Sequence, residues 1–293
     1  MTVRESAVGC VFNLSRRNWK SVQEFCDIAH ADFFFARISL PWLRWSWPMA
    51  EYVLRVGCKS AQGLRSNNED RFVVDPDARL FLVADGMGGQ DRGEQASGLA
   101  AEIIPRVVKD QLAANEPATA AVQKALTEAN KAIIYAGQSQ PTGRRMGTTA
   151  VVALQQDSQV YVAGLGDSRA YLIRGQRVEQ LTVDHSVAQE LVSNGVLSPD
   201  EARSSPWQNV LHKFLGCTEM VDGADVRPFR PHAGDRLLLA SDGLTNHIME
   251  DDLRAGPRDF PDPQDWADHL VQCALERGSR DNVTCVVVAF LPE

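Results

Sequence analysis

The sequence lacks the features that mark membrane-spanning, secreted and nucleic-acid-binding proteins. No apolar run among its 293 residues reaches the length of about 20 that a spanning helix needs. The N-terminus lacks the succession of basic, apolar and cleavage regions that a secretory signal requires. Acidic residues outnumber basic ones, with a formal net charge of −8, so no nucleic-acid partner is expected.

Paired cysteines are also missing. The six cysteines, at 10, 26, 58, 217, 273 and 285, form no C-x-x-C pair and show no spacing typical of a metal site. They fit reduced thiols in a cytoplasmic protein, although an even number alone leaves disulfides open. A hydrophobic content of 44% is ample for a folded core, and the length favours one large domain or two small ones.

Composition shifts near Met49. Residues 1–48 hold six Lys and Arg against four Asp and Glu, and they contain four of the six tryptophans. The remainder, 49–293, holds 24 basic against 34 acidic residues and is predicted to be the main domain. Two hypotheses stay open for 1–48: an upstream extension of the reading frame, or an arm that docks on a membrane surface or a partner through its aromatic residues. Under both hypotheses poor packing is expected, because the spacing of proline and arginine leaves the segment without a consistent apolar face.

Short strands in two groups, with long helices between and after them, favour an α+β fold. Strands are predicted at 52–59, 71–74, 79–84, 148–154, 159–163, 169–174, 236–240 and 283–290. Helices are predicted at 93–111, 117–138, 186–194, from the capping box at 198–201, and at 262–277. Pro105 is expected to kink or end the first of these helices.

Single aspartates recur at the ends of apolar stretches. "LFLVADG" ends in Asp85 and "LLLASDG" in Asp242, while Asp167 and Asp281 come just before apolar runs. A lone charged carboxylate is costly to bury. Four at strand ends therefore indicate a shared partner, and the usual partner of clustered carboxylates is a hard divalent cation.

Neighbouring residues extend this set. Glycine follows Asp85, so the Gly86 carbonyl is open to an ion and adds an oxygen ligand. "SNNEDR" adds Glu69 and Asp70 just before a strand, and Arg65 is suited to grip a phosphate with two hydrogen bonds. Each piece has a plainer reading, since Asp-Gly is a common turn and an arginine near acids is usually a surface ion pair. The hypothesis rests on the set.

The set resembles the metal-dependent Ser/Thr protein phosphatases of the type 2C family in their bacterial form. The matching pieces occur in the family order over about residues 52–290: "GLRSNNEDRF", "LVADGMGGQDRGEQAS", "GTTAV", "GLGDSRAYLIR", "LTVDHS", "NVLHKFLG", "LLLASDGLT" and "DNVTCVVV". The resemblance implies a central β-sandwich of two mainly antiparallel sheets, with helices on both outer faces in four layers. It also implies two tightly bound Mn²⁺ or Mg²⁺ ions in a cleft at one end, and a weaker third.

By the same resemblance, Asp85 looks like the carboxylate that bridges both metals, and Gly86 like a backbone carbonyl ligand. Asp242 and Asp281 look like direct ligands of one metal. Asp167 is similar to the residue that helps to hold the weaker third metal in bacterial members.

The remaining roles also come from the resemblance. Glu69 looks like a ligand acting partly through water, Asp70 like an acceptor that orients metal-bound water, and Arg65 like the phosphate clamp. Residues 186–216 look like a mobile flap beside the cleft. Met87 departs from the animal enzymes, which carry a histidine proposed as general acid there, so the proton donor is open.

The implied activity is one-step hydrolysis of phosphoserine and phosphothreonine by a hydroxide bridging the two cations. The expected partners are phosphoprotein substrates, a bacterial Ser/Thr kinase or its targets. Two rivals stay open: a pseudophosphatase that binds phosphoproteins without turnover, and a metal-dependent enzyme acting on small phosphoesters. Intact Asp85, Asp242 and Asp281 argue against the first.

Overall fold

The computed structural model describes residues 52–88, 92–138, 146–218 and 224–293. The predicted domain boundary at residue 49 lies outside these ranges and stays a prediction. The same holds for the expected poor packing and the two hypotheses for residues 1–48. None of the helices in the described ranges is long and apolar enough to cross a membrane.

Two sheets in which every pairing is antiparallel form the centre of the domain. The first has the order β1 (Tyr52–Ala61), β11 (Val283–Pro292), β10 (Arg236–Ala240), β7 (Arg169–Arg174) and β8 (Arg177–Gln180). The second has the order β2 (Asp70–Asp75), β3 (Leu80–Met87), β5 (Ala150–Gln156), β6 (Gln159–Leu165) and β9 (Val226–Phe229), with β4 (Gly147–Thr148) paired to β3.

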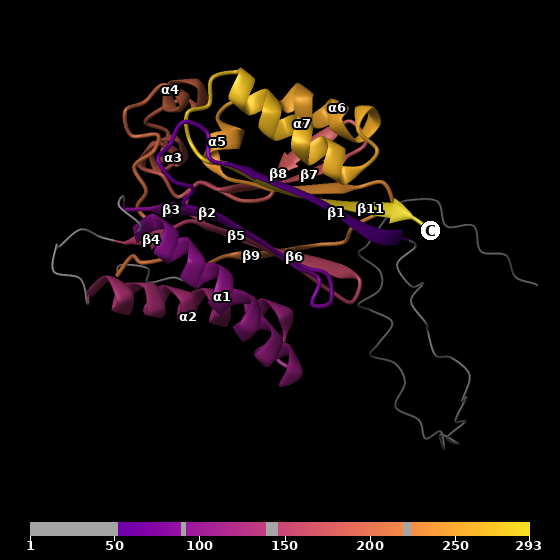
Figure 1. The fold of residues 1–293 in the computed structure, drawn as a ribbon, viewed down its shortest axis with the longest axis horizontal. Coiled ribbons are helices and arrows are strands. Elements are labelled where there is room, and N and C mark those ends of the chain that lie inside the picture. The colour runs from indigo at the N-terminus through magenta and orange to yellow at the C-terminus, as the bar shows by residue number, and fades with distance from the viewer. Residues whose placement is uncertain (1–51, 89–91, 139–145, 219–223) are drawn as a thin grey trace, which may run out of the picture. The chain divides into compact units, whose positions relative to one another are not determined.

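Helices cover the outer face of each sheet (Figure 1). On the second sheet lie α1 (Arg92–Ala113) and α2 (Ala118–Gln138); on the first lie α5 (Asp242–Thr245), α6 (Glu250–Asp259) and α7 (Pro263–Glu276). The short helices α3 (Val187–Ser193) and α4 (Pro199–Arg203) lie at one end of the sheets (Figure 1). The predicted four-layer β-sandwich is confirmed.

The strands β3 and β11 show no alternation of apolar and polar residues because both of their faces are buried. In β3, Leu80, Leu82 and Ala84 face the helices α1 and α2, whereas Phe81 and Val83 pack between the sheets. In β11, Val286, Val288 and Phe290 likewise join the inter-sheet core, and the intervening residues face α7. Charged groups are therefore tolerated only where these strands end.

Pro105 was expected to kink or end the first helix, and it does not end it. The helix α1 runs through it, and Pro105 is itself buried together with Ile104 and Val108. Packing of this face against α2 and β3 offsets the hydrogen bond that proline removes. The capping box at Ser198 and Glu201 is confirmed, with reciprocal bonds at the start of α4.

Two elements that the sequence did not predict also contain proline. Pro228 is tolerated in β9 because this strand pairs only with β6, at the edge of its sheet. The helix α6 contains Gly256 and Pro257. Its glycine lies directly against the buried ring of Trp266, where any side chain would overlap the indole, so tertiary packing decides the structure here.

Candidate metal centre and phosphate site

The antiparallel pairing brings the predicted acidic residues to one end of the sandwich. Asp70 opens β2 directly opposite Asp85, which lies near the end of β3. Asp242 follows β10 and Asp281 precedes β11, and these two strands are paired through Ala240 and Cys285. The end of one antiparallel strand lies beside the start of its neighbour, so residues far apart in sequence meet at the same edge.

Asp167 joins the group in the same way. It lies in the turn between β6 and β7, and the first residue of β7, Arg169, pairs with Ala240 near Asp242. The turn includes Gly166 with φ +94°, a backbone conformation that glycine adopts without strain.

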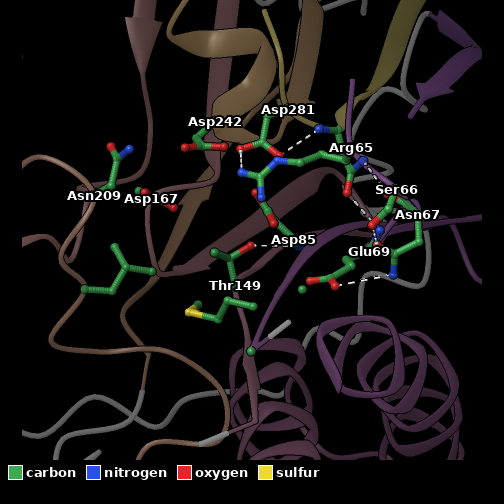
Figure 2. A pocket seen from close by; sticks show the side chains of 15 residues that line it. Arg65, Ser66, Asn67, Glu69, Asp85, Thr149, Asp167, Asn209, Asp242 and Asp281 are labelled. Carbon is green, nitrogen blue, oxygen red and sulfur yellow. Dashed lines mark hydrogen bonds and ion pairs between the residues drawn. The ribbon is translucent and has the colours of Figure 1, made fainter. Parts of the chain in front are cut away.

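Apart from Asp70, these side chains line a cavity of about 310 Å³ at the end of the sheets (Figure 2). Five of the predicted residues contribute acidic side chains to its wall: Glu69, Asp85, Asp167, Asp242 and Asp281. Arg65, Gly86 and Met87 also line it. Asp70 does not line the cavity and lies behind it.

Three glycines allow the backbone to close around this cavity. A side chain on Gly86 would overlap the Gly93 carbonyl, and one on Gly93 would overlap the Glu69 carboxylate. A side chain on Gly243 would overlap the Asn282 carbonyl. The glycines that follow Asp85 and Asp242, together with Gly93, are thus needed for close packing and not only for a turn.

Asp70 is a buried acid with an incomplete set of hydrogen bonds. The residue is 2% exposed, and its Oδ2 accepts from the Ser241 hydroxyl at 2.9 Å. Its Oδ1 has no partner among the described residues. Burial is the main cause that raises the pKa of Asp70 to about 6; the Thr284 and Ser241 hydroxyls oppose the rise, and the Asp242 and Asp281 carboxylates add to it.

The pKa values of three carboxylates in the cavity wall, Asp85, Asp167 and Asp242, are raised, first by burial and then by neighbouring acids. Burial raises the pKa of Asp85 well above its ordinary value, and the nearby Asp70 and Asp242 add to that effect. Burial and the charge of Asp242 raise the pKa of Asp167 to about 7. The pKa of Asp242 is raised by burial and then by Asp281. Such a cluster is unfavourable when ionised unless a cation neutralises it, so the residues fit a divalent metal chemically.

The side chains do not yet surround a single point in ligand geometry. Across the described ranges, no three His, Cys, Asp or Glu side chains form a complete metal-binding group. The Arg65 Nη2 lies 2.6 Å from Asp281 Oδ2, so this carboxylate faces a guanidinium instead of the other acids (Figure 2). The Asp85 and Asp242 side chains remain close enough to share a hydrogen bond.

Several residues that organise the site were not singled out in the sequence. The Asn282 side chain accepts from Glu69 N at 2.8 Å and donates to the Gln62 and Asn67 carbonyls at 2.9 Å each. The Thr149 hydroxyl accepts from Asp85 N at 2.9 Å. Asn282 and Thr149 both fall inside the quoted motifs "DNVTCVVV" and "GTTAV", so the motifs held the signal although no role had been assigned.

A half-buried ion pair lies next to the turn that carries Asp167. Arg169 Nε and Nη2 donate to the two Asp184 oxygens at 2.9 and 2.6 Å. The pair joins "GLGDSRAYLIR" to "LTVDHS", so these two motifs meet in space.

The sequence model described as Protein phosphatase 2C matches residues 59–291. The chain belongs to the protein phosphatase 2C family. The Listeria monocytogenes protein named serine/threonine phosphatase stp is 35% identical over 231 residues, 77% of this chain and 91% of that protein. Family membership confirms the predicted class of enzyme, a protein-serine/threonine phosphatase.

Solved structures of phosphatases in this family share the fold. The Mycobacterium tuberculosis serine/threonine phosphatase PstP/Ppp superposes with a TM-score of 0.73 and 33% identity, covering 81% of this chain and 99% of that one. The PstP catalytic domain, described as a complex with two manganese ions, gives a TM-score of 0.70 at 32% identity, over 81% and 98% of the two chains. The assignment of individual residues to the metals stays a prediction.

Proposed function

We propose that this chain hydrolyses phosphoserine and phosphothreonine in proteins, with divalent cations held in the acidic cavity. The observation that carries the proposal is the meeting of Asp85, Asp242, Asp281 and Glu69 at one end of the sandwich, beside an exposed arginine. Carboxylates so placed suit Mn²⁺ or Mg²⁺, and a guanidinium suits a phosphate.

Within this proposal, Asp85, the Gly86 carbonyl, Asp242, Asp281 and Glu69 would hold two cations. Asp167, on the far side of the cavity from Arg65, helps to hold a weaker third ion (Figure 2). When bound, the cations supply Lewis-acid chemistry: they lower the pKa of water and neutralise charge on the phosphoryl group.

Arg65 positions the substrate. Its side chain is 60% exposed, within reach of an entering phosphate, and its only described ion pair is with Asp281. With Asp281 bound to a cation, the guanidinium fork would be free to donate two hydrogen bonds to phosphate oxygens. Binding of metal and binding of phosphate are therefore expected to favour each other.

Asp70 acts on the attacking water from behind the metal ligands. Its Oδ2 is fixed by Ser241, whereas Oδ1 has no protein partner among the described residues. A carboxylate oxygen held in this way would accept a hydrogen bond from a water molecule lying between Asp70 and the cavity wall, and would orient that water. No role for a cysteine or histidine nucleophile is needed.

The proposed partners are targets of a bacterial Ser/Thr kinase, or the kinase itself, and the proposed location is the cytoplasm. The support for the location is chemical: Cys58, Cys217, Cys273 and Cys285 are all free thiols. Free thiols are typical of proteins in reducing compartments. The proposed catalytic unit is 49–293, and a protein lacking 1–48 should keep the activity of the full chain.

A phosphate-release assay tests this function. The substrates are phosphoserine, phosphothreonine and phosphotyrosine peptides and a nucleotide, each assayed with Mn²⁺ and with chelator. We expect Mn²⁺-dependent release from the first two peptides and little from the nucleotide. Asp242→Asn should lower turnover by several orders of magnitude. Preference for the nucleotide would favour an enzyme of small phosphoesters, and binding of phosphopeptide without turnover would indicate a pseudophosphatase.

A further inference from the structure

A second cavity lies beside the metal site. It measures about 190 Å³ and is bounded by the α3–α4 segment (residues 186–216) and by α5. It shares Asp167, Asn209 and Asp242 with the first cavity. The wall between the two cavities is therefore made partly of predicted metal ligands and partly of residues from the α3–α4 segment.

Three residues that line this second cavity are joined by two hydrogen bonds. Asn246 Nδ2 donates to Asp242 Oδ2 at 3.3 Å, and Gln208 Nε2 donates to Asn246 Oδ1 at 3.3 Å. The direction is fixed by chemistry, because an ionised carboxylate only accepts hydrogen bonds. The Asn246 amide must turn its nitrogen to Asp242, which leaves its oxygen for a donor, and Gln208 is that donor.

The helix α5 accounts for the first of these bonds. Asp242 and Asn246 are four residues apart, so their side chains lie on the same face of the helix. The backbone N–H of Asn246 separately closes the end of α5 by donating to the Asp242 carbonyl. An amide at this position supports the carboxylate without adding charge to an already acidic cavity.

The second bond reaches the α3–α4 segment. Gln208 lies in a turn in which its own N–H donates to the Ser205 carbonyl at 3.1 Å. The same turn accepts bonds from the start of α3: Val187 N donates to the Val210 carbonyl at 2.8 Å. Because these backbone hydrogen bonds tie the turn to α3, Gln208 moves together with the α3–α4 segment.

We propose that Asn246 is a positioning residue that sets the Asp242 carboxylate and links it, through Gln208, to the α3–α4 segment. The inference rests on the proposed function, because it requires a cation at Asp242. Both bonds are long, so the link is made or broken at small cost. A link of this kind works in both directions: cation binding at Asp242 steadies the segment, and a substrate that holds the segment strengthens cation binding.

Two measurements on the full chain test this link: Mn²⁺ affinity by titration calorimetry, and amide hydrogen exchange of residues 186–216 with and without Mn²⁺. The variants are Asn246→Leu, which removes both bonds, and Gln208→Ala, which cuts only the bond to the segment. Gln189→Ala is the matched control, because Gln189 lines the same cavity from α3 but its side chain is not part of the two-bond chain.

Asn246→Leu should weaken Mn²⁺ binding by about tenfold, the lower range for loss of a group that orients a metal ligand. Gln208→Ala should lose less affinity. In both variants Mn²⁺ should no longer slow exchange in 186–216, whereas the unaltered protein and Gln189→Ala should show the slowing.

The link would be overturned if Mn²⁺ still slowed amide exchange in residues 186–216 of Gln208→Ala. It would also be overturned if Gln189→Ala lost this slowing as completely as Gln208→Ala. Unchanged Mn²⁺ affinity in a folded Asn246→Leu protein would overturn the positioning role. Absence of Mn²⁺ binding by the unaltered protein would refute the metal centre itself, and this inference with it.

Discussion

Replacing Asp70 by asparagine should stabilise the metal-free protein and at the same time impair the enzyme. Asp70 is buried, its Oδ1 has no protein partner in the described ranges, and neighbouring carboxylates oppose its ionisation. Asparagine keeps the acceptor for Ser241 and removes the charge. Its amide nitrogen would donate toward the acidic cavity, where acceptors are abundant.

The size of the effect follows from the raised pKa. A pKa change of one corresponds to ~1.4 kcal/mol, so the rise from 3.8 to about 6 corresponds to ~3 kcal/mol at pH 7. Because the folded-state pKa is raised, the stability that the protonated carboxyl contributes is present below about pH 4 and is lost as the pH rises through about 6. For a domain of this size, the gain in Asp70→Asn is roughly 6–12 °C in Tm at pH 7.

Thermal unfolding in chelator at pH 7 and at pH 4 checks this prediction. The gain should appear at pH 7 and vanish at pH 4, where Asp70 is itself neutral. Asp235→Asn is the matched control: Asp235 is also 2% exposed, but it is paired with Arg174 at 2.6 Å, so its replacement should destabilise the protein at pH 7. A lowered Tm in both variants at pH 7 would refute the claim that the acidic site stores repulsion.

Three further substitutions test individual assignments. Arg65→Ala should raise KM for phosphopeptide, and lysine should restore only part of the binding because the two-pronged contact is lost; unchanged kcat and KM would reject the role. Gly93→Ala places a methyl group against the Glu69 carboxylate, so the Mn²⁺ affinity measured by calorimetry should fall. The control Gly98→Ala, where an added methyl group has nothing within 4 Å, should leave the affinity unchanged. Equal affinities in the two variants would contradict the role of Glu69 as a metal ligand. Asp167→Ala should keep two tight metals and lose activity at low metal concentration, and loss of a tight site would contradict this.

Much of the site could be predicted because each acidic residue lies where a buried strand ends. Asp85 and Asp242 both follow apolar runs that turned out to be covered on two faces. A charged residue at the end of such a run is costly to bury without a partner, so its functional role can be inferred from the sequence alone. The meeting of the acids needed more: it depends on antiparallel register, which the family resemblance supplied and the strand pattern alone did not.

The parts that could not be predicted depend on contacts between distant segments. Nothing local in "DNV" shows that the Asn282 amide holds two loops and Glu69 together. Pro105 reads as a helix breaker because its burial against neighbouring elements is invisible in the sequence. Gly256 reads as a weak helix residue until the Trp266 ring is placed against it. In each case tertiary packing outweighs local preference.

Diffraction from crystals grown with Mn²⁺, collected at an energy where manganese scatters anomalously, would locate the metals. Two strong anomalous peaks are expected in the cavity, with the Asp85 carboxylate between them and the Gly86 carbonyl bound to one. Arg65 should have left Asp281. Absence of anomalous density near Asp85, or a single ion bound away from Asp242 and Asp281, would contradict the assignment of this cluster as the metal centre.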